Sequence, residues 1–207
     1  TRDYVIRREF DLAEGDAFNQ VMIQKGKRRL EKLGFFERVE VSTVPGDQPD
    51  QVVLVVDVVE KSTGEFSVGA GYTTGGENSG VNLEAGITER NFLGRGQFVK
   101  VSIGGTTDSR TYNLSFTEPY FLGYRIAAGF DIFKSNTSYD AYEVDRNGAT
   151  VRFGLPITDQ LSGQIAYNIV QDEYGARDTN EDGLILPPEG LPAYVPEGEW
   201  LKSSLSY

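Results

Sequence analysis

Two residue types that carry much of enzyme chemistry are missing from this sequence of 207 residues, which has no cysteine and no histidine. Without cysteine there is no disulfide framework, no thiol nucleophile and no thiolate metal site. Without histidine the chain lacks the usual general base, the serine–histidine dyad and the commonest ligand of transition metals. We therefore expect a protein that is not an enzyme.

A basic charge balance and a long apolar run are missing too. The chain has 20 basic and 31 acidic residues, for a net charge of -11. This balance argues against nucleic acid as a partner, because phosphate binding needs a basic surface. No signal peptide is visible at Thr1, and no run of about 18 apolar residues can span a membrane as a helix. A transmembrane β-barrel is not excluded, since its strands alternate apolar and polar residues.

The first sixty residues predict the order helix, helix, strand, strand. Asp3 can cap a short helix through residues 4–9. The run AFNQVMIQKGKRRLEKLG predicts an amphipathic helix with Gly34 as its C-terminal cap. Its expected apolar stripe is Phe18, Val21, Met22, Leu30 and Leu33. FFERVEVSTV and QVVLVVDVVE predict two strands joined by a turn at residues 45–47.

Beyond Gly64 the residues alternate with a period of two in eight segments, which predicts β-strands. Short connections such as ERNFLGRGQ and EPYFLGY take turns with longer polar ones, as in outer-membrane barrels. Aromatic residues gather near the expected strand ends, as in membrane-interface girdles: Phe92, Tyr120, Phe121, Tyr124 and Trp200. The predicted fold is an antiparallel transmembrane β-barrel. A soluble antiparallel sandwich is the alternative, because its strands alternate as well.

One stretch has the spacing of a calcium loop. DTNEDGLILPPE follows the pattern D-x-[DN]-x-[DN]-G-x5-E, with Asp178, Asn180, Asp182 and Glu189 as candidate ligands. A calcium sensor needs a helix on each side, and two prolines at 187–188 stand where the second helix would begin. We therefore predict no calcium switch. Static calcium binding stays open beside an ordinary acidic surface loop, and no other cofactor is expected.

Five stretches of the chain, in order, resemble the BamA family of outer-membrane protein assembly factors. They are RREFDLAEGDAFN, RRLEKLGFFERVEV, VVDVVEKSTGEFSVGAGY, TERNFLGRGQ and SFTEPYFLGYRIAAG. The residues that carry the two most specific motifs are Asn91, Phe92, Leu93, Gly94, Gly96, Glu118, Pro119, Tyr120 and Phe121. The resemblance implies that the chain is a fragment. Residues 1–62 would be most of the last periplasmic POTRA (α+β) domain without its first strand, and 63–207 the N-terminal half of the barrel.

The resemblance also implies a function. Family members fold and insert β-barrel proteins into the bacterial outer membrane, with the POTRA part in the periplasm. The partners implied are unfolded outer-membrane β-barrel substrates, lipoproteins of the assembly machinery and outer-membrane lipid.

A lateral gate is implied for the first barrel strand, which accepts an incoming strand by β-augmentation. Its residues are Glu65, Phe66, Ser67, Val68, Gly69, Ala70, Gly71 and Tyr72. Glycine weakens strand pairing, which suits a gate. The alternative is that these glycines relieve crowding inside the barrel.

Other functions stay open at this point. A two-partner secretion or TamA-like transporter also joins POTRA domains to a barrel, and a soluble calcium-binding β-sandwich is the second alternative. In the first sixty residues, the strand VEVSTV offers an edge for an extended partner. The basic helix face from Lys25 to Lys32 can meet an acidic partner, although such a run is more often a solvated surface.

Overall fold

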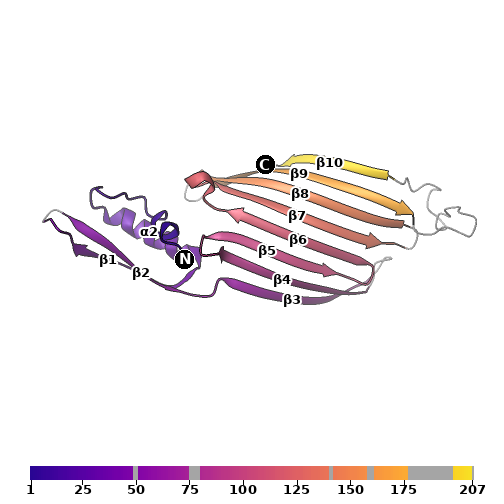
Figure 1. The fold of residues 1–207 in the computed structure, drawn as a ribbon, viewed down its shortest axis with the longest axis horizontal. Coiled ribbons are helices and arrows are strands. Elements are labelled where there is room, and N and C mark those ends of the chain that lie inside the picture. The colour runs from indigo at the N-terminus through magenta and orange to yellow at the C-terminus, as the bar shows by residue number, and fades with distance from the viewer. Residues whose placement is uncertain (49–50, 75–79, 140–141, 158–160, 177–197, 207) are drawn as a thin grey trace, which may run out of the picture. The chain divides into compact units, whose positions relative to one another are not determined.

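The computed structural model describes residues 1–48, 51–74, 80–139, 142–157, 161–176 and 198–206 (Figure 1). The chain divides into two compact units. Unit 1 comprises Thr1–Gly64 together with Glu89–Gln97, and unit 2 comprises Glu65–Thr88 together with Phe98–Tyr207. Within the described ranges, no helix has both the length and the apolar character needed to cross a membrane.

Unit 1 begins with two helices, α1 (Asp3–Arg7) and α2 (Gln20–Leu33), in the predicted order. The predicted cap of α1 is wrong. Asp3 is the first helical residue, and its carboxylate accepts a 2.6 Å hydrogen bond from Nε of Arg7 one turn later. At the start of α2, the side-chain oxygen of Asn19 accepts hydrogen bonds from the first backbone N–H groups. Gly34 ends the helix in the left-handed conformation, as predicted.

The buried face of α2 differs from the predicted stripe. The helix buries Ile23, Gly26 and Leu30, whose spacing of three and four residues matches the helical period. Val21 is 77% exposed instead. The prediction is confirmed for Leu30 and Leu33, which lie in or against the core, and is wrong for the N-terminal part of the stripe, because Phe18 lies before the Asn19 cap and outside the helix.

A two-stranded antiparallel sheet completes unit 1. It pairs β1 (Phe36–Pro45) with β2 (Val52–Glu60), which confirms the predicted hairpin. The core joins α1, α2 and the start of β1 through Val5, Leu30, Phe35, Phe36 and Val39. Arg29 ties α2 to the segment that precedes it, because its guanidinium pairs with Asp11 at 2.7 Å.

The remaining strands form one eight-stranded sheet. Their bounds are β3 (Gly64–Thr73), β4 (Gly80–Phe92), β5 (Gln97–Gly105), β6 (Ser109–Glu118), β7 (Ala127–Ser138), β8 (Tyr142–Pro156), β9 (Ser162–Ala176) and β10 (Gly198–Ser206). A 3₁₀ turn, η1 (Phe121–Gly123), precedes β7. Sheet order follows chain order from β3 to β10, and the pairs from β5 to β10 are antiparallel. The alternative of a sandwich is contradicted, because that fold needs two sheets packed face to face.

The two faces of this sheet differ in chemistry. Side chains alternate between faces along each strand, and large apolar ones on one face are exposed, among them Phe66, Leu83, Ile132 and Tyr167. The other face carries small and polar residues and the ion pairs described below. This matches the alternation predicted from the sequence. Trp200 does not fit its predicted place in an aromatic girdle, because it pairs with Asp172 and so lies on the polar face.

Candidate functional site

The predicted gate residues lie on β3, at one end of the sheet order, where β4 is the only strand paired with β3 among the described residues. Every residue of β3 is exposed, and Phe66 and Tyr72 expose 73% and 70% of their surface. A strand paired on one side only presents a row of free N–H and C=O groups to another strand. All eight predicted gate residues therefore lie on the strand that ends the described sheet.

Two of the three glycines of β3, Gly69 and Gly71, are not crowded by other described residues, whereas a Cβ atom added at Gly64 would come within 3.1 Å of Glu89 Oε2. A Cβ atom added at Gly71 would meet nothing within 4 Å, and one added at Gly69 would meet only Cβ of Glu84, at 4.0 Å. Their effect on β3 is therefore on strand pairing and backbone freedom, since glycine has no side chain to pack.

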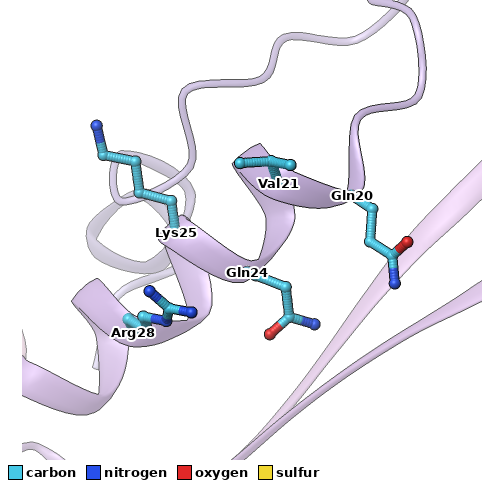
Figure 2. Close-up of a pocket in the computed structure, with 5 residues that line it drawn as sticks. All are labelled: Gln20, Val21, Gln24, Lys25 and Arg28. Atoms are coloured by element: carbon cyan, nitrogen blue, oxygen red, sulfur yellow. The ribbon is translucent and has the colours of Figure 1, made fainter.

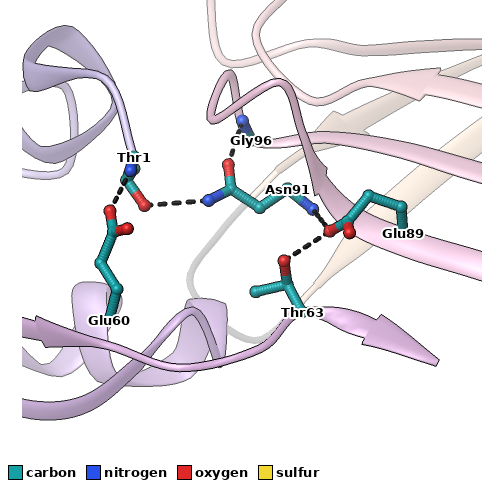
Figure 3. A network of polar contacts seen from close by, with 6 residues as sticks. All are labelled: Thr1, Glu60, Thr63, Glu89, Asn91 and Gly96. Carbon is teal, nitrogen blue, oxygen red and sulfur yellow. Dashed lines mark hydrogen bonds and ion pairs between the residues drawn. The ribbon is translucent and has the colours of Figure 1, made fainter.

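The NFLGRG motif lies in the turn from β4 to β5, inside unit 1 (Figure 3). Asn91 is the centre of its hydrogen bonds. Its Nδ2 donates to the hydroxyl of Thr1 at 2.9 Å, and its Oδ1 accepts from the N–H of Gly96 at 2.7 Å. Its own N–H donates to Glu89 Oε1 at 2.8 Å, and the same carboxylate accepts from the Thr63 hydroxyl. Three stretches far apart in sequence meet at this amide.

The two glycines of this motif are needed for space as well as conformation. Both have positive φ, 71° at Gly94 and 70° at Gly96. A Cβ at Gly94 would come within 3.3 Å of the Thr1 backbone. A Cβ at Gly96 would come within 2.5 Å of Arg8 Nη2 and 3.2 Å of Val5 in the unit 1 core. The N–H of Arg2 also donates to the Gly94 carbonyl at 2.7 Å.

Glu60, at the end of β2, lies beside Thr1 in the same cluster and contacts its backbone nitrogen (Figure 3).

The EPYF motif is part of an internal repeat that the sequence analysis missed. The pattern T-E-x-x-F-L-G occurs at residues 88–94 and again at 117–123. Both copies make the same turn: the glutamate accepts from the N–H two residues on, at 2.8 Å for Glu89 and 3.0 Å for Glu118. Leu93 and Leu122 have φ of 54° and 55°, and each is followed by a glycine with positive φ.

These turns have the geometry of a type I′ hairpin turn, with both central residues left-handed. Asparagine or aspartate is the usual first central residue, and leucine costs about 1–2 kcal/mol more there. The signal that would have found the repeat is the identity of five positions at the same spacing, which only a search for internal repeats reveals.

The basic face predicted on α2 is only partly available. A hollow of about 480 Å³ is lined by Gln20, Val21, Gln24, Lys25 and Arg28. Figure 2 shows Gln20 and Gln24 extending to one side of the helix and Lys25 to the other. Further along the helix, Arg29 is paired with Asp11, and Lys27 lies 3.9 Å from Glu31. Part of the expected charge is therefore neutralised within unit 1.

Ion pairs on the polar face of the sheet were not predicted. Asp172 on β9 is fully buried. Its carboxylate accepts hydrogen bonds from Nε and Nη2 of Arg146 on β8, at 2.6 and 3.2 Å, and from Nζ of Lys202 on β10, at 2.7 Å. Arg152 on β8 pairs with Asp131 on β7 in the same way. Strands β7–β10 are therefore linked by charged side chains.

The candidate calcium ligands at 178–189 lie outside the described residues. Among the residues that the structure describes, no group of three or more acidic side chains is placed to hold a metal ion. In the EPYF motif, Glu118 is the last residue of β6, and Pro119 follows it in the connection to η1.

Comparisons with known proteins agree with this arrangement. The family model of the Omp85 superfamily domain matches residues 91–207, and the POTRA model, described as a surface antigen variable number repeat, matches residues 1–61. The outer membrane protein assembly factor BamA of Neisseria meningitidis serogroup B is 31% identical over 167 residues, which cover 77% of this chain and 21% of the relative. BamA of Nitratidesulfovibrio vulgaris is 29% identical over 189 residues, covering 91% of this chain and 23% of the relative.

Two solved structures are also similar to this chain. The crystal structure of BamA from Haemophilus ducreyi lacking POTRA domains 1–3 matches 99% of this chain and 40% of that one, with a TM-score of 0.73 and 27% identity. CdiB from Acinetobacter baumannii shares the fold, with a TM-score of 0.58 and 14% identity over 84% of this chain and 35% of that one. The chain spans about a fifth to a quarter of the length of the curated BamA relatives described above.

Proposed function

Because this chain belongs to the Omp85 superfamily, we propose that it is part of an outer-membrane protein assembly factor that folds and inserts β-barrel proteins. Proteins of this kind lie in the outer membrane, with their POTRA domains in the periplasm. The observation that carries the proposal is the match of nearly the whole chain to BamA, at a TM-score of 0.73. In this assignment residues 1–62 are the last POTRA domain and 63–207 the beginning of the barrel.

Inserting a barrel into a membrane does not require any covalent bond to be broken. A strand that enters lipid alone leaves its backbone N–H and C=O groups without partners, and each such group costs several kcal/mol in hydrocarbon. A template strand with a free edge removes this cost, because the incoming strand pairs as it leaves the water. A protein with this role is not an enzyme.

The lateral gate is assigned to β3. In support, β3 ends the described sheet, is exposed along its whole length and carries two glycines, Gly69 and Gly71, that no described neighbour crowds. Strands β7–β10 are linked by ion pairs on the polar face. An incoming strand of a substrate would pair with β3 by β-augmentation.

The partners follow from this assignment. Unfolded outer-membrane β-barrel proteins are the substrates, and outer-membrane lipid contacts the apolar face of the sheet. Assembly lipoproteins dock on the POTRA part, where the candidate surfaces are the β1–β2 sheet, whose outer edges pair with no other described strand, and the basic face of α2.

The test is depletion of the full-length protein in its own cell, followed by quantification of many unrelated outer-membrane barrels by mass spectrometry. A fall in all of them supports a general assembly factor. Loss of one secreted partner, with the other barrels unchanged, sinks the proposal.

The second candidate is a dedicated transporter. It is favoured by one observation, the shared fold with CdiB. At 14% identity this likeness concerns the fold alone, and the depletion experiment separates the two functions.

A further inference from the structure

The apolar face of the sheet has a polar notch that neither the family nor the proposed function explains. Strand registers line up residues of β5–β9 in rows across this face. One row is apolar throughout: Val101, Leu114, Ile132, Ala149 and Ile169. The next row, toward the ends where β5 connects to β6 and β7 to β8, turns polar at β7: Ile103, Tyr112, Lys134, Asn147 and Gln171. The row beyond contains Gly105, Arg110, Asn136, Asp145 and Glu173.

The positive and the negative side chains of this notch lie on different strands. The two cations, Arg110 and Lys134, lie on β6 and β7, while the carboxylates Asp145 and Glu173 lie on β8 and β9. Arg110 and Lys134 are exposed, and neither makes an ion pair with another described residue. Asp145 is engaged by the side-chain amide of Asn136, which donates to its Oδ1. The positive charge on β6 and β7 is therefore free for a ligand.

We propose that Arg110 and Lys134 bind the phosphate headgroup of an anionic lipid in the outer leaflet. The inference rests on the proposed barrel, whose apolar face contacts lipid and whose outer rim carries the β5–β6 and β7–β8 connections. Arg110 pairs with Asn136, two residues from Lys134, so the two cations are diagonal neighbours on one face. Diagonal neighbours are about 7–8 Å apart, and both long side chains reach a common phosphate from that distance.

The residues below the cations fit the rest of a lipid. Tyr112 lies directly opposite Lys134, and its ring is apolar while its hydroxyl suits a wet interface. Leu114 and Ile132, 37% and 48% exposed, form the next row. A headgroup on the cations would therefore place its acyl chains on these apolar side chains. The carboxylates on β8 and β9 repel an anionic headgroup and confine it to β6 and β7.

The test uses the full-length protein, purified in a mild detergent and mixed with phosphatidylglycerol or phosphatidylcholine, with bound lipid counted by native mass spectrometry. The wild type is expected to retain phosphatidylglycerol in preference. A basic residue near the surface contributes about fivefold to binding of anionic lipid. Lys134→Gln should lower retention by about that factor, Lys134→Gln with Arg110→Gln further, and Lys134→Arg should retain it.

The matched control is Lys100→Gln, which removes one exposed charge from β5 on the opposite face. It should leave retention unchanged. Equal losses for Lys100→Gln and Lys134→Gln, or none for the double variant, would overturn the site. Inorganic phosphate that displaces the lipid at equal concentration would overturn the role of the apolar row. Lipid retention is measured on the purified protein and does not depend on the depletion experiment. A failure of the lipid site can therefore be told apart from a failure of the proposed assembly function.

Discussion

The side-chain amide of Asn91, on β4, donates a 2.9 Å hydrogen bond to the hydroxyl of Thr1 at the other end of unit 1's sequence. The same side chain accepts from Gly96, so one amide closes the turn and joins it to the start of the chain. A carboxylate at this position could not donate to Thr1, and an aliphatic residue could do neither. This explains why an asparagine opens the NFLGRG motif.

We expect Asn91→Ala to destabilise unit 1 by about 2 kcal/mol, since two hydrogen bonds are lost at about 1 kcal/mol each. Hydrogen exchange of peptides covering residues 1–8 and 89–97 in the full-length protein is the measurement, and both should exchange faster. Asn82→Ala, an exposed asparagine on the same strand, is the control and should change neither. Unchanged exchange in Asn91→Ala would show that the amide bridge does not hold the turn.

Two glycines with positive φ, Gly123 and Gly96, separate steric from conformational cost. Gly123→Ala should cost about 1–2 kcal/mol, because its φ is 81° but no atom lies within 4 Å of the added Cβ. Gly96→Ala should cost about 1–3 kcal/mol more, since its Cβ would also meet Arg8 and Val5. The midpoint of thermal unfolding, followed by the gel shift of the folded barrel, ranks the two variants. Equal effects would mean that the tight packing around Gly96 relaxes freely.

The buried carboxylate on the polar face gives a third prediction. Asp172→Asn leaves Arg146 and Lys202 without their common anion, although both cations are partly exposed to water. We expect a loss of about 2 kcal/mol, below the 3–5 kcal/mol of a fully buried pair. Chemical unfolding in detergent measures it. Glu199→Gln, an exposed carboxylate on β10, is the control, and an equal loss there would remove the special role of Asp172.

The gate can be tested by strengthening β3. Gly69→Val with Gly71→Val raises β-propensity, and the glycines have open space for the new side chains. If β3 must separate from the last strand of the full-length barrel to accept a substrate, the rate of barrel insertion in reconstituted vesicles should fall by roughly fivefold, as the span of about 1 kcal/mol in β-propensity implies. Gly175→Val is the control, because it makes the same change on β9, away from the gate, where an added Cβ would also meet nothing within 4 Å. An undiminished rate in a folded double variant would contradict the gate.

The strands of the sheet were predictable because alternation with a period of two is a local property, set by the pleat of the backbone. The same holds for Gly34, which ends α2 for a reason visible in its own conformation. The prediction for α2 failed at Phe18, because this residue was placed on the apolar stripe of the helix but lies before the helix begins. Whether a given apolar residue is buried depends on where the helix starts, and the side-chain cap of Asn19 sets that start.

Sequence by itself determined the two-part organisation, the eight alternating strands and the motifs that identify the superfamily, because each depends on residues close together in the chain. The tertiary structure alone decided that Asn91 meets Thr1, that Asp172 meets Arg146 and Lys202, and that Arg110 and Lys134 stand together above an apolar row. These contacts join distant residues through strand register. A shift of one residue in register moves every side chain to the opposite face, so no local pattern can specify them.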